Sequence, residues 1–190
     1  METPLKLLSL DISSHTGFAV FNVSELQEFG LINIEIKDFK ATQHPEKHPS
    51  YPQNLFDAAD VLANHIEFLV KKHQPNQVVI ENTVCGRQRS SQRMLEWFHF
   101  TTLKRLQALQ IPFAYMDPSE WRKVLEMRLS KEEKQNNRQV SQGLKRGRIT
   151  KKHLSVNLAN EHFGLSLKQK ENDIADAINL GSAFLKRLTS

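Results

Sequence analysis

The sequence predicts one α/β domain on a mixed sheet, in which a three-strand antiparallel meander is followed by parallel strands with helical crossovers, and helices cover both faces. Two observations support this prediction. Three strand-like segments lie close together within residues 7–36, and their short links are compatible with hairpins. From residue 53, helical and strand-like segments alternate, as is typical of parallel strands joined by helices. The length of 190 residues suits a single domain.

The predicted meander consists of Leu7–Ile12, Gly17–Val23 and Gly30–Ile36. The first segment is a short, mostly apolar run that ends in polar residues, as expected of a buried strand. In the third segment, isoleucines alternate with other residues, which indicates a strand with one buried face. Residues 39–51 are polar and contain prolines, so we expect a loop there.

The alternating part begins with an amphipathic helix over Gln53–His73, whose apolar residues recur at helical spacing. Pro118, at the first position of a later short helix, and Gly164, just after another helix, are favourable at those ends. The predicted elements that follow residue 73 are a strand at 77–81, a helix at 89–110, a strand at 112–116, a helix at 118–125, a helix from 150 or 151 to 163 and a helix at 172–188.

Residues 130–150 form a basic, polar insertion or loop in this otherwise single domain. They are rich in Lys, Arg, Gln and Asn and contain few apolar residues. Two interpretations stay open, a mobile loop and an exposed helix that becomes ordered on contact with a partner.

The composition narrows the range of partners. A formal net charge of +5 and a pI of about 9.4 favour a polyanion, usually nucleic acid and sometimes a membrane surface. Cys85 is the single cysteine, so no intramolecular disulfide can form, and we expect a cytoplasmic protein. No apolar run approaches 18 residues, so we expect no membrane partner.

Four acidic residues stand out by position. Asp11 and Glu81 end buried strands, whereas Asp173 and Asp176 lie one turn apart near the start of the last helix. Each has an ordinary structural explanation, such as turn capping or a favourable helix-dipole position. Asp176 fits such explanations least, because its neighbours are small and apolar and a buried carboxylate needs a cation or a donor. Together, the four carboxylates suggest a site for two divalent ions that cleaves phosphodiesters.

Three motifs then carry a family resemblance. The segment Leu8–Ala19 resembles the first hairpin of the RuvC-type Holliday-junction resolvases, with a strand, an Asp, a turn and Thr-Gly before the second strand. Val78–Glu81 looks like their second motif, a strand that ends in a catalytic Glu. Asn172–Ala177 is similar to their C-terminal Asp-x-x-Asp-Ala helix. The order and spacing of the three motifs fit across nearly the whole chain.

The resemblance implies a ribonuclease-H-like fold and a homodimer that cuts two opposed strands of four-way or branched DNA. It assigns Asp11, Glu81, Asp173 and Asp176 as catalytic ligands of Mg²⁺ or Mn²⁺, two ions per site, with Asp176 rated above Asp173. The segment Asn82–Gly86 departs from many bacterial members because it has no aromatic residue. This departure and the long polar segment suggest a divergent, phage-type resolvase.

Basic residues are predicted to contact nucleic-acid phosphates near this acidic site. A solvated basic surface is the alternative for these residues, and a lysine at 151 or 152 is also a candidate to stabilise charge in the transition state. The predicted phosphate-binding residues are Arg87, Arg89, Arg93, Lys145, Arg146, Arg148, Lys151 and Lys152.

Other interpretations remain beside the junction resolvase. A nuclease of the same fold that acts on flaps, RNA–DNA hybrids or duplex would have the same acids, and a non-catalytic nucleic-acid-binding module would have lost at least one of them. Trp97, Phe98 and Phe100 fit either a dimer interface or core packing, and Trp121 fits a packing anchor better than a base-stacking residue.

Overall fold

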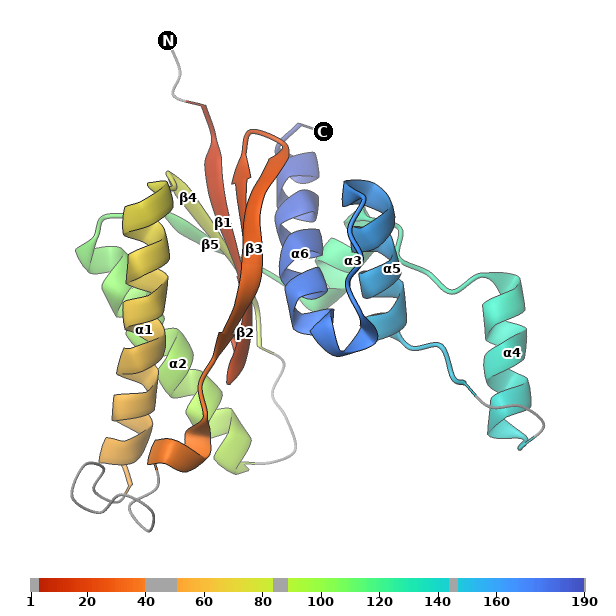
Figure 1. The fold of residues 1–190 in the computed structure, drawn as a ribbon, viewed down its shortest axis with the longest axis horizontal. Helices are drawn as coiled ribbons and strands as arrows, with labels where there is room; N and C mark the ends of the chain where they lie inside the picture. The colour runs from red at the N-terminus through yellow and green to blue at the C-terminus, as the bar shows by residue number, and fades with distance from the viewer. Residues whose placement is uncertain (1–3, 40–50, 84–88, 144–146, 190) are drawn as a thin grey trace.

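A computed structural model describes residues 4–39, 51–83, 89–143 and 147–189, and a five-stranded mixed sheet forms its centre (Figure 1). The two hairpin pairings are antiparallel and the two later pairings are parallel, as the sequence predicted. In spatial order, the strands are β3 (Glu25–Asn33), β2 (His15–Asn22), β1 (Lys6–Asp11), β4 (Gln77–Glu81) and β5 (Phe113–Met116).

Helices cover both faces of this sheet. On one face lie α1 (Gln53–His73) and α2 (Arg89–Ala108), and on the other lie α3 (Pro118–Val124), α5 (Lys151–Phe163) and α6 (Asn172–Leu188) (Figure 1). A further helix, α4 (Lys131–Ser141), projects from the body. Short 3-10 turns occupy Ile36–Phe39 and Gln169–Glu171. Among the described residues, no helix is both long and apolar enough to cross a membrane.

The central strand β1 is buried on both faces because its side chains alternate between two cores. Leu8 and Leu10 pack with α1 and α2, whereas Leu7 packs with α3, α5 and α6. Ser9 also faces α6, where its Oγ atom donates a hydrogen bond of 2.7 Å to the carbonyl of Ala177. The apolar run that predicted a buried strand therefore serves two separate layers.

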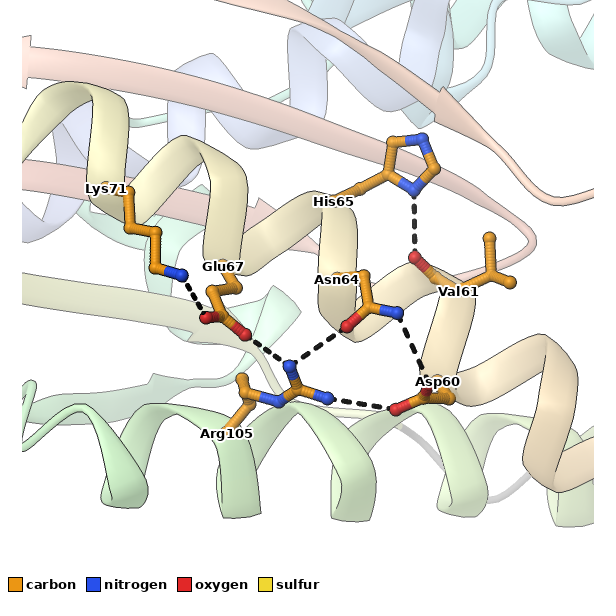
Figure 2. A network of polar contacts seen from close by, with 7 residues as sticks. All are labelled: Asp60, Val61, Asn64, His65, Glu67, Lys71 and Arg105. Carbon is orange, nitrogen blue, oxygen red and sulfur yellow. Dashed lines mark hydrogen bonds and ion pairs between the residues drawn. The ribbon is translucent and has the colours of Figure 1, made fainter.

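Arg105 links the two helices of the first layer. Its guanidinium, on α2, donates to Asp60 Oδ1 at 2.9 Å, to Asn64 Oδ1 at 2.9 Å and to Glu67, all on α1 (Figure 2). Lys71 pairs with Glu67 from the next turn. The side-chain hydrogen bond from Lys71, followed by that from Arg105, lowers the pKa of Glu67.

Two predicted segments differ in detail from the structure. The third strand is Glu25–Asn33 rather than Gly30–Ile36, because the strand pairing with β2 ends where His15 faces Asn33. Ile32 and Ile34 are nevertheless buried, so the alternation marked the correct inner face. The polar segment 130–150 contains a regular helix, α4, over Lys131–Ser141.

Close approach of α6 to the sheet depends on glycine at position 17. A Cβ atom built on Gly17 would lie 1.9 Å from the carbonyl oxygen of Asp173. Gly17→Ala should therefore push α6 away from β2 and lower the free energy of unfolding by about 2–3 kcal/mol. The melting temperature should fall by about 6 °C in a chain of this size.

Gly143→Ala is the matched control for this substitution. Among the described residues, a Cβ atom at Gly143 meets nothing within 4 Å, and its positive φ of 75° opposes alanine at a cost of about 1 kcal/mol. Thermal unfolding followed by circular dichroism compares the two variants. Equal losses in both would show that the contact between β2 and α6 is not tight.

Candidate active site

The ends of β1 and β4 bring Asp11 and Glu81 side by side. These strands are parallel neighbours, and Leu10 faces Ile80 in their register. The next residue of each strand is the acid, so both carboxylates emerge at the same edge of the sheet. Ligand sites in sheets with parallel strands commonly occur at the carboxyl ends of the strands.

The tight packing of α6 adds the other two acids. Asp11 faces Gly17 in the pairing of β1 with β2, and Gly17 touches the backbone of Asp173 at the start of α6. Asp176 follows one turn later on the same helix. Residues at opposite ends of the chain therefore converge because a strand end and a helix start meet at one glycine.

The pKa values of these carboxyl groups record their convergence. Burial, followed by the charges of Glu81, Asp176 and Asp173, raises the pKa of Asp11 well above its ordinary value. Burial raises the pKa of Glu81 to about 6, and the negative charges of Asp176 and Asp173 add to this effect. The pKa of Asp176 is also raised, chiefly by burial. Such shifts, with like charges in one place, are typical of functional sites.

Asp176 has one oxygen atom without a hydrogen-bond partner among the described residues. Its Oδ1 atom is buried, whereas Ser155 on α5 forms a hydrogen bond to the carboxylate. Ser155 is itself held by Asn179, whose Nδ2 atom donates to Ser155 Oγ at 2.9 Å. A buried carboxylate oxygen without a donor is costly unless a cation binds it.

The carboxylate oxygens of the four acids fit a divalent metal ion. Carboxylate oxygens are the ligands that Mg²⁺ and Mn²⁺ prefer, and cations would relieve both the mutual repulsion and the unpaired Asp176 oxygen. Within the described ranges, no three Asp, Glu, His or Cys side chains already form a group arranged to hold one ion. Asn172 Nδ2 also donates to Asp173 Oδ1.

Sequence reasoning missed two residues of the site, Trp121 as a donor and Arg122. Trp121 is fully buried, as a packing anchor should be, but its Nε1 atom also donates a hydrogen bond of 2.6 Å to Glu81 Oε2. The Arg122 guanidinium lies 4.5 Å from the centroid of the Trp121 ring. Its charge also opposes the rise in the pKa of Glu81 and of Asp176. A buried indole needs an acceptor for its N–H group, which was the available signal.

Trp121→Phe should weaken this support while keeping an aromatic ring in the core. The indole hydrogen bond lowers the pKa of Glu81, so its loss should raise that pKa further above 6. We expect the affinity of the site for a divalent metal ion to fall by about 10- to 100-fold, as is usual when a group that orients a metal ligand is removed. The pH below which the ion is released should move to a higher value.

Trp97→Phe makes the same chemical change on the opposite face of the sheet and serves as the control. Trp97 packs against the core of α1 and α2, away from the acids. An unchanged pH dependence of metal binding in Trp121→Phe would mean that the indole only fills space.

The predicted basic residues are distributed more widely than the acids. Lys152, in the first turn of α5, lies near the acids, since its charge lowers the pKa of both Asp11 and Asp176. Arg148 instead faces α4, and Lys151 is exposed. Arg93 lies over the Tyr51 ring, 5.8 Å from its centroid. Arg89 begins α2. Arg87, Lys145 and Arg146 lie outside the described residues.

Comparison with known proteins gives fold neighbours only. No sequence family and no curated protein matches the chain. RuvC from Thermus thermophilus, in complex with a Holliday junction substrate, is 12% identical with a TM-score of 0.65, over 97% of this chain and 95% of that chain. A further Thermus thermophilus RuvC structure is 13% identical, with a TM-score of 0.65 over 97% of this chain and 96% of that chain.

The yeast mitochondrial Holliday junction resolvase is 15% identical, with a TM-score of 0.55 over 98% of this chain and 80% of that chain. At these identities the likeness shows the fold. The mixed ribonuclease-H-like sheet predicted from the sequence is confirmed, and the resemblance to the RuvC-type resolvases holds at the level of the fold.

Proposed function

We propose that this chain is a metal-dependent endodeoxyribonuclease that resolves Holliday junctions or other branched DNA by paired nicks. The observation that carries the proposal is the convergence of Asp11, Glu81, Asp173 and Asp176 where β1 and β4 end, expressed in the raised pKa values of three of them. The fold neighbours include a resolvase in complex with a Holliday junction, which favours branched DNA as the substrate.

The four carboxylates are proposed to hold two Mg²⁺ or Mn²⁺ ions. Such ions, when bound, would supply positive charge that polarises the scissile phosphate and makes the attacking water more acidic. Trp121 keeps Glu81 oriented through its indole N–H group, and Ser155 keeps Asp176 oriented from α5. Both carboxylates are therefore held in place before substrate arrives, which lowers the cost of organising the site.

Lys152 is the basic residue best placed to act on the substrate. It is near Asp11 and Asp176, and in the described part of the chain it forms no ion pair with either. We assign it to a phosphate next to the cleavage point, where its charge would offset that of the transition state. Arg122, stacked on Trp121, would moderate the negative potential of the site from the other side.

The proposed assembly is a homodimer, because a four-way junction has twofold symmetry and needs two cuts. The three aromatic residues of α2 for which the sequence left two roles open differ in their exposure. Phe98 is fully buried and Trp97 packs on the core, with an edge-to-face contact to Phe56 at 6.2 Å between ring centroids. Phe100 is 59% exposed and lines a groove of about 310 Å³ with Trp97 and Glu96. We propose this surface as the dimer contact.

Phe100→Glu should therefore produce a monomer. Glutamate removes the apolar ring and places a charge in the contact, which opposes association of the two α2 surfaces. Light scattering coupled to size exclusion should give about half the wild-type mass, and junctions should be nicked singly rather than in pairs. Phe68→Glu makes the same change at a residue of α1 that is 64% exposed, and should leave the mass unchanged. If the Phe100→Glu protein is still a dimer, this surface of α2 does not form the dimer interface.

The proposed function is tested with a labelled four-way junction and a linear duplex of the same sequence. Each is incubated with the protein in Mg²⁺, Mn²⁺ or EDTA. We expect symmetric nicks in the junction that require the metal. Metal-dependent cutting of flaps, hybrids or duplex alone would retain a nuclease and contradict the resolvase. Binding without cutting would favour the non-catalytic module. The proposed setting is recombination and repair in the cytoplasm, which the single Cys85 fits.

A further inference from the structure

The projecting helix α4 has no buried side chain and stands apart from the sheet and its covering helices (Figure 1). A helix that is polar on all sides gains little from packing, and 11 residues is short for an isolated helix in water. Local contacts support it instead. Ser130 Oγ accepts from the Glu133 backbone N–H at 3.1 Å, and Glu133 Oε2 accepts from the Ser130 backbone N–H at 2.7 Å.

Asparagine side chains of α4 also hold the segment that follows it. Asn137 Nδ2 donates to the Ile149 carbonyl at 2.8 Å, and the Ile149 backbone N–H donates to Asn137 Oδ1 at 2.8 Å. Asn136 Nδ2 donates to the Gly147 carbonyl at 3.2 Å. Residues 147–150 are thereby fixed beside α4. Between the two lies an open groove of about 490 Å³.

Apart from Leu129, the residues that line this groove are basic or polar. Lys134 and Arg138 lie one turn apart on α4, Arg148 approaches from the fixed segment, and Asn137, Ser141 and Gln142 add polar groups. All three cations are exposed, and within the described ranges none forms an ion pair. The two acids of α4 are used at its start, where Glu132 and Glu133 both bond to Ser130. Arg105, by contrast, is neutralised by acids of α1 (Figure 2).

We propose that this groove binds the sugar–phosphate backbone of a duplex DNA arm. The proposal rests on the proposed function and deepens it. Unpaired lysine and arginine side chains with neighbouring amide and hydroxyl groups are the usual contacts to phosphate oxygens. Among the described residues, no aromatic side chain lines the groove, which favours a duplex backbone over a single strand with stacked bases.

The connection to the acids gives the groove its place on the substrate. Residues 147–150, fixed by Asn137, lead directly into α5, and the second residue of α5 is Lys152, next to Asp11. The same short segment therefore supports both the groove and the edge of the acidic site. DNA held in the groove would continue toward the site where cleavage is proposed.

The test combines Lys134→Gln with Arg138→Gln in the full chain. Its matched control, Lys71→Gln with Lys72→Gln, removes two positive charges from exposed residues of α1 on the other side of the molecule. Fluorescence anisotropy measures affinity for a four-way junction, a linear duplex and a single strand across a range of KCl concentrations in Ca²⁺ or EDTA. Because Lys134 and Arg138 are both exposed, the groove variant should keep the melting temperature of the wild type.

We expect the groove variant to lose about 10-fold in junction and duplex affinity, and its salt slope to fall by about 1.8, as for two lost phosphate contacts. Equal affinities and slopes in the groove and control variants would overturn the proposal, and so would a loss confined to the single strand. Cleavage assays on the wild type report on the proposed function separately. A chain that cuts no branched DNA, yet loses duplex affinity in the groove variant, would retain the groove and contradict the resolvase.

Discussion

Asp11→Asn should reduce metal-dependent cleavage by at least about 10³-fold. Asp11 ends β1 among the other three acids, and its pKa responds to all of them. Asparagine keeps the size of the side chain but removes a negative charge that the cations need. Each 1.36 kcal/mol of lost charge stabilisation slows the reaction tenfold, and the loss of this charge should amount to several kcal/mol. Single-turnover cleavage of a labelled junction in saturating Mg²⁺ measures the effect.

The same substitution should stabilise the fold in EDTA. Burial, followed by repulsion from Glu81, raises the pKa of Asp11, so keeping an aspartate there costs folding free energy at neutral pH. A higher melting temperature together with lost cleavage would separate catalysis from folding. Asp57→Asn, on the helix that covers the other face, is the control and should cut normally. Cleavage by Asp11→Asn at the wild-type rate would remove Asp11 from the active site.

Glu81→Gln should raise the free energy of unfolding in EDTA at pH 7 by about 2 kcal/mol. Glu81 has a pKa of about 6 in the fold, against 4.5 ordinarily, and one pKa unit corresponds to about 1.36 kcal/mol. Glutamine avoids this cost and can still accept the Trp121 hydrogen bond. The melting temperature should rise by about 4–8 °C for a chain of this length. Urea unfolding at several pH values measures the free energy of unfolding, and thermal unfolding measures the melting temperature.

The pH dependence has a definite sign. Between pH 4.5 and 6 the folded state keeps the Glu81 proton while the unfolded state has released it, so wild-type stability falls as pH rises through this window. Asp11 and Asp176 act in the same direction, because their pKa values are also raised. In Glu81→Gln the free energy of unfolding should change less with pH, because the contribution of Glu81 is absent.

Glu28→Gln provides a control of opposite sign. The hydrogen bond from Lys72 lowers the pKa of Glu28. Loss of the Glu28 carboxylate should therefore reduce the free energy of unfolding above pH 4.5 rather than raise it. Equal shifts in both variants would contradict the electrostatic account of the acidic site.

Divalent metal should reverse the pH trend of the wild type. Mg²⁺ at 100 times its dissociation constant adds about 2.7 kcal/mol to the free energy of unfolding. This gain should increase with pH, because the carboxylates must lose their protons to bind the ion. Glu81→Gln should lose most of the gain. A wild-type protein whose melting temperature does not respond to Mg²⁺ or Mn²⁺ at pH 8 would contradict the proposed metal site.

The sequence alone determined most of the strands and helices and the positions of the four acids, but not the bounds of β3 or the helix α4. A buried strand such as β1 reads as an apolar run, and the long helix Gln53–His73 has helical spacing along its whole length, because these signals depend on near neighbours. The signal that places an acidic residue at the end of a strand also depends on near neighbours in the sequence. Asp11 and Glu81 could therefore be selected before any packing was known.

Only the tertiary structure decided which distant residues meet. Gly17 sets α6 against β2 and so brings Asp173 to Asp11, and the Trp121 indole reaches Glu81 from another helix. The structure also separated Lys152, beside the acids, from Arg148, which faces α4. Such contacts depend on strand register and on close approach of backbones. Neither has a periodic signal in the chain, because both arise from packing between segments far apart in the sequence.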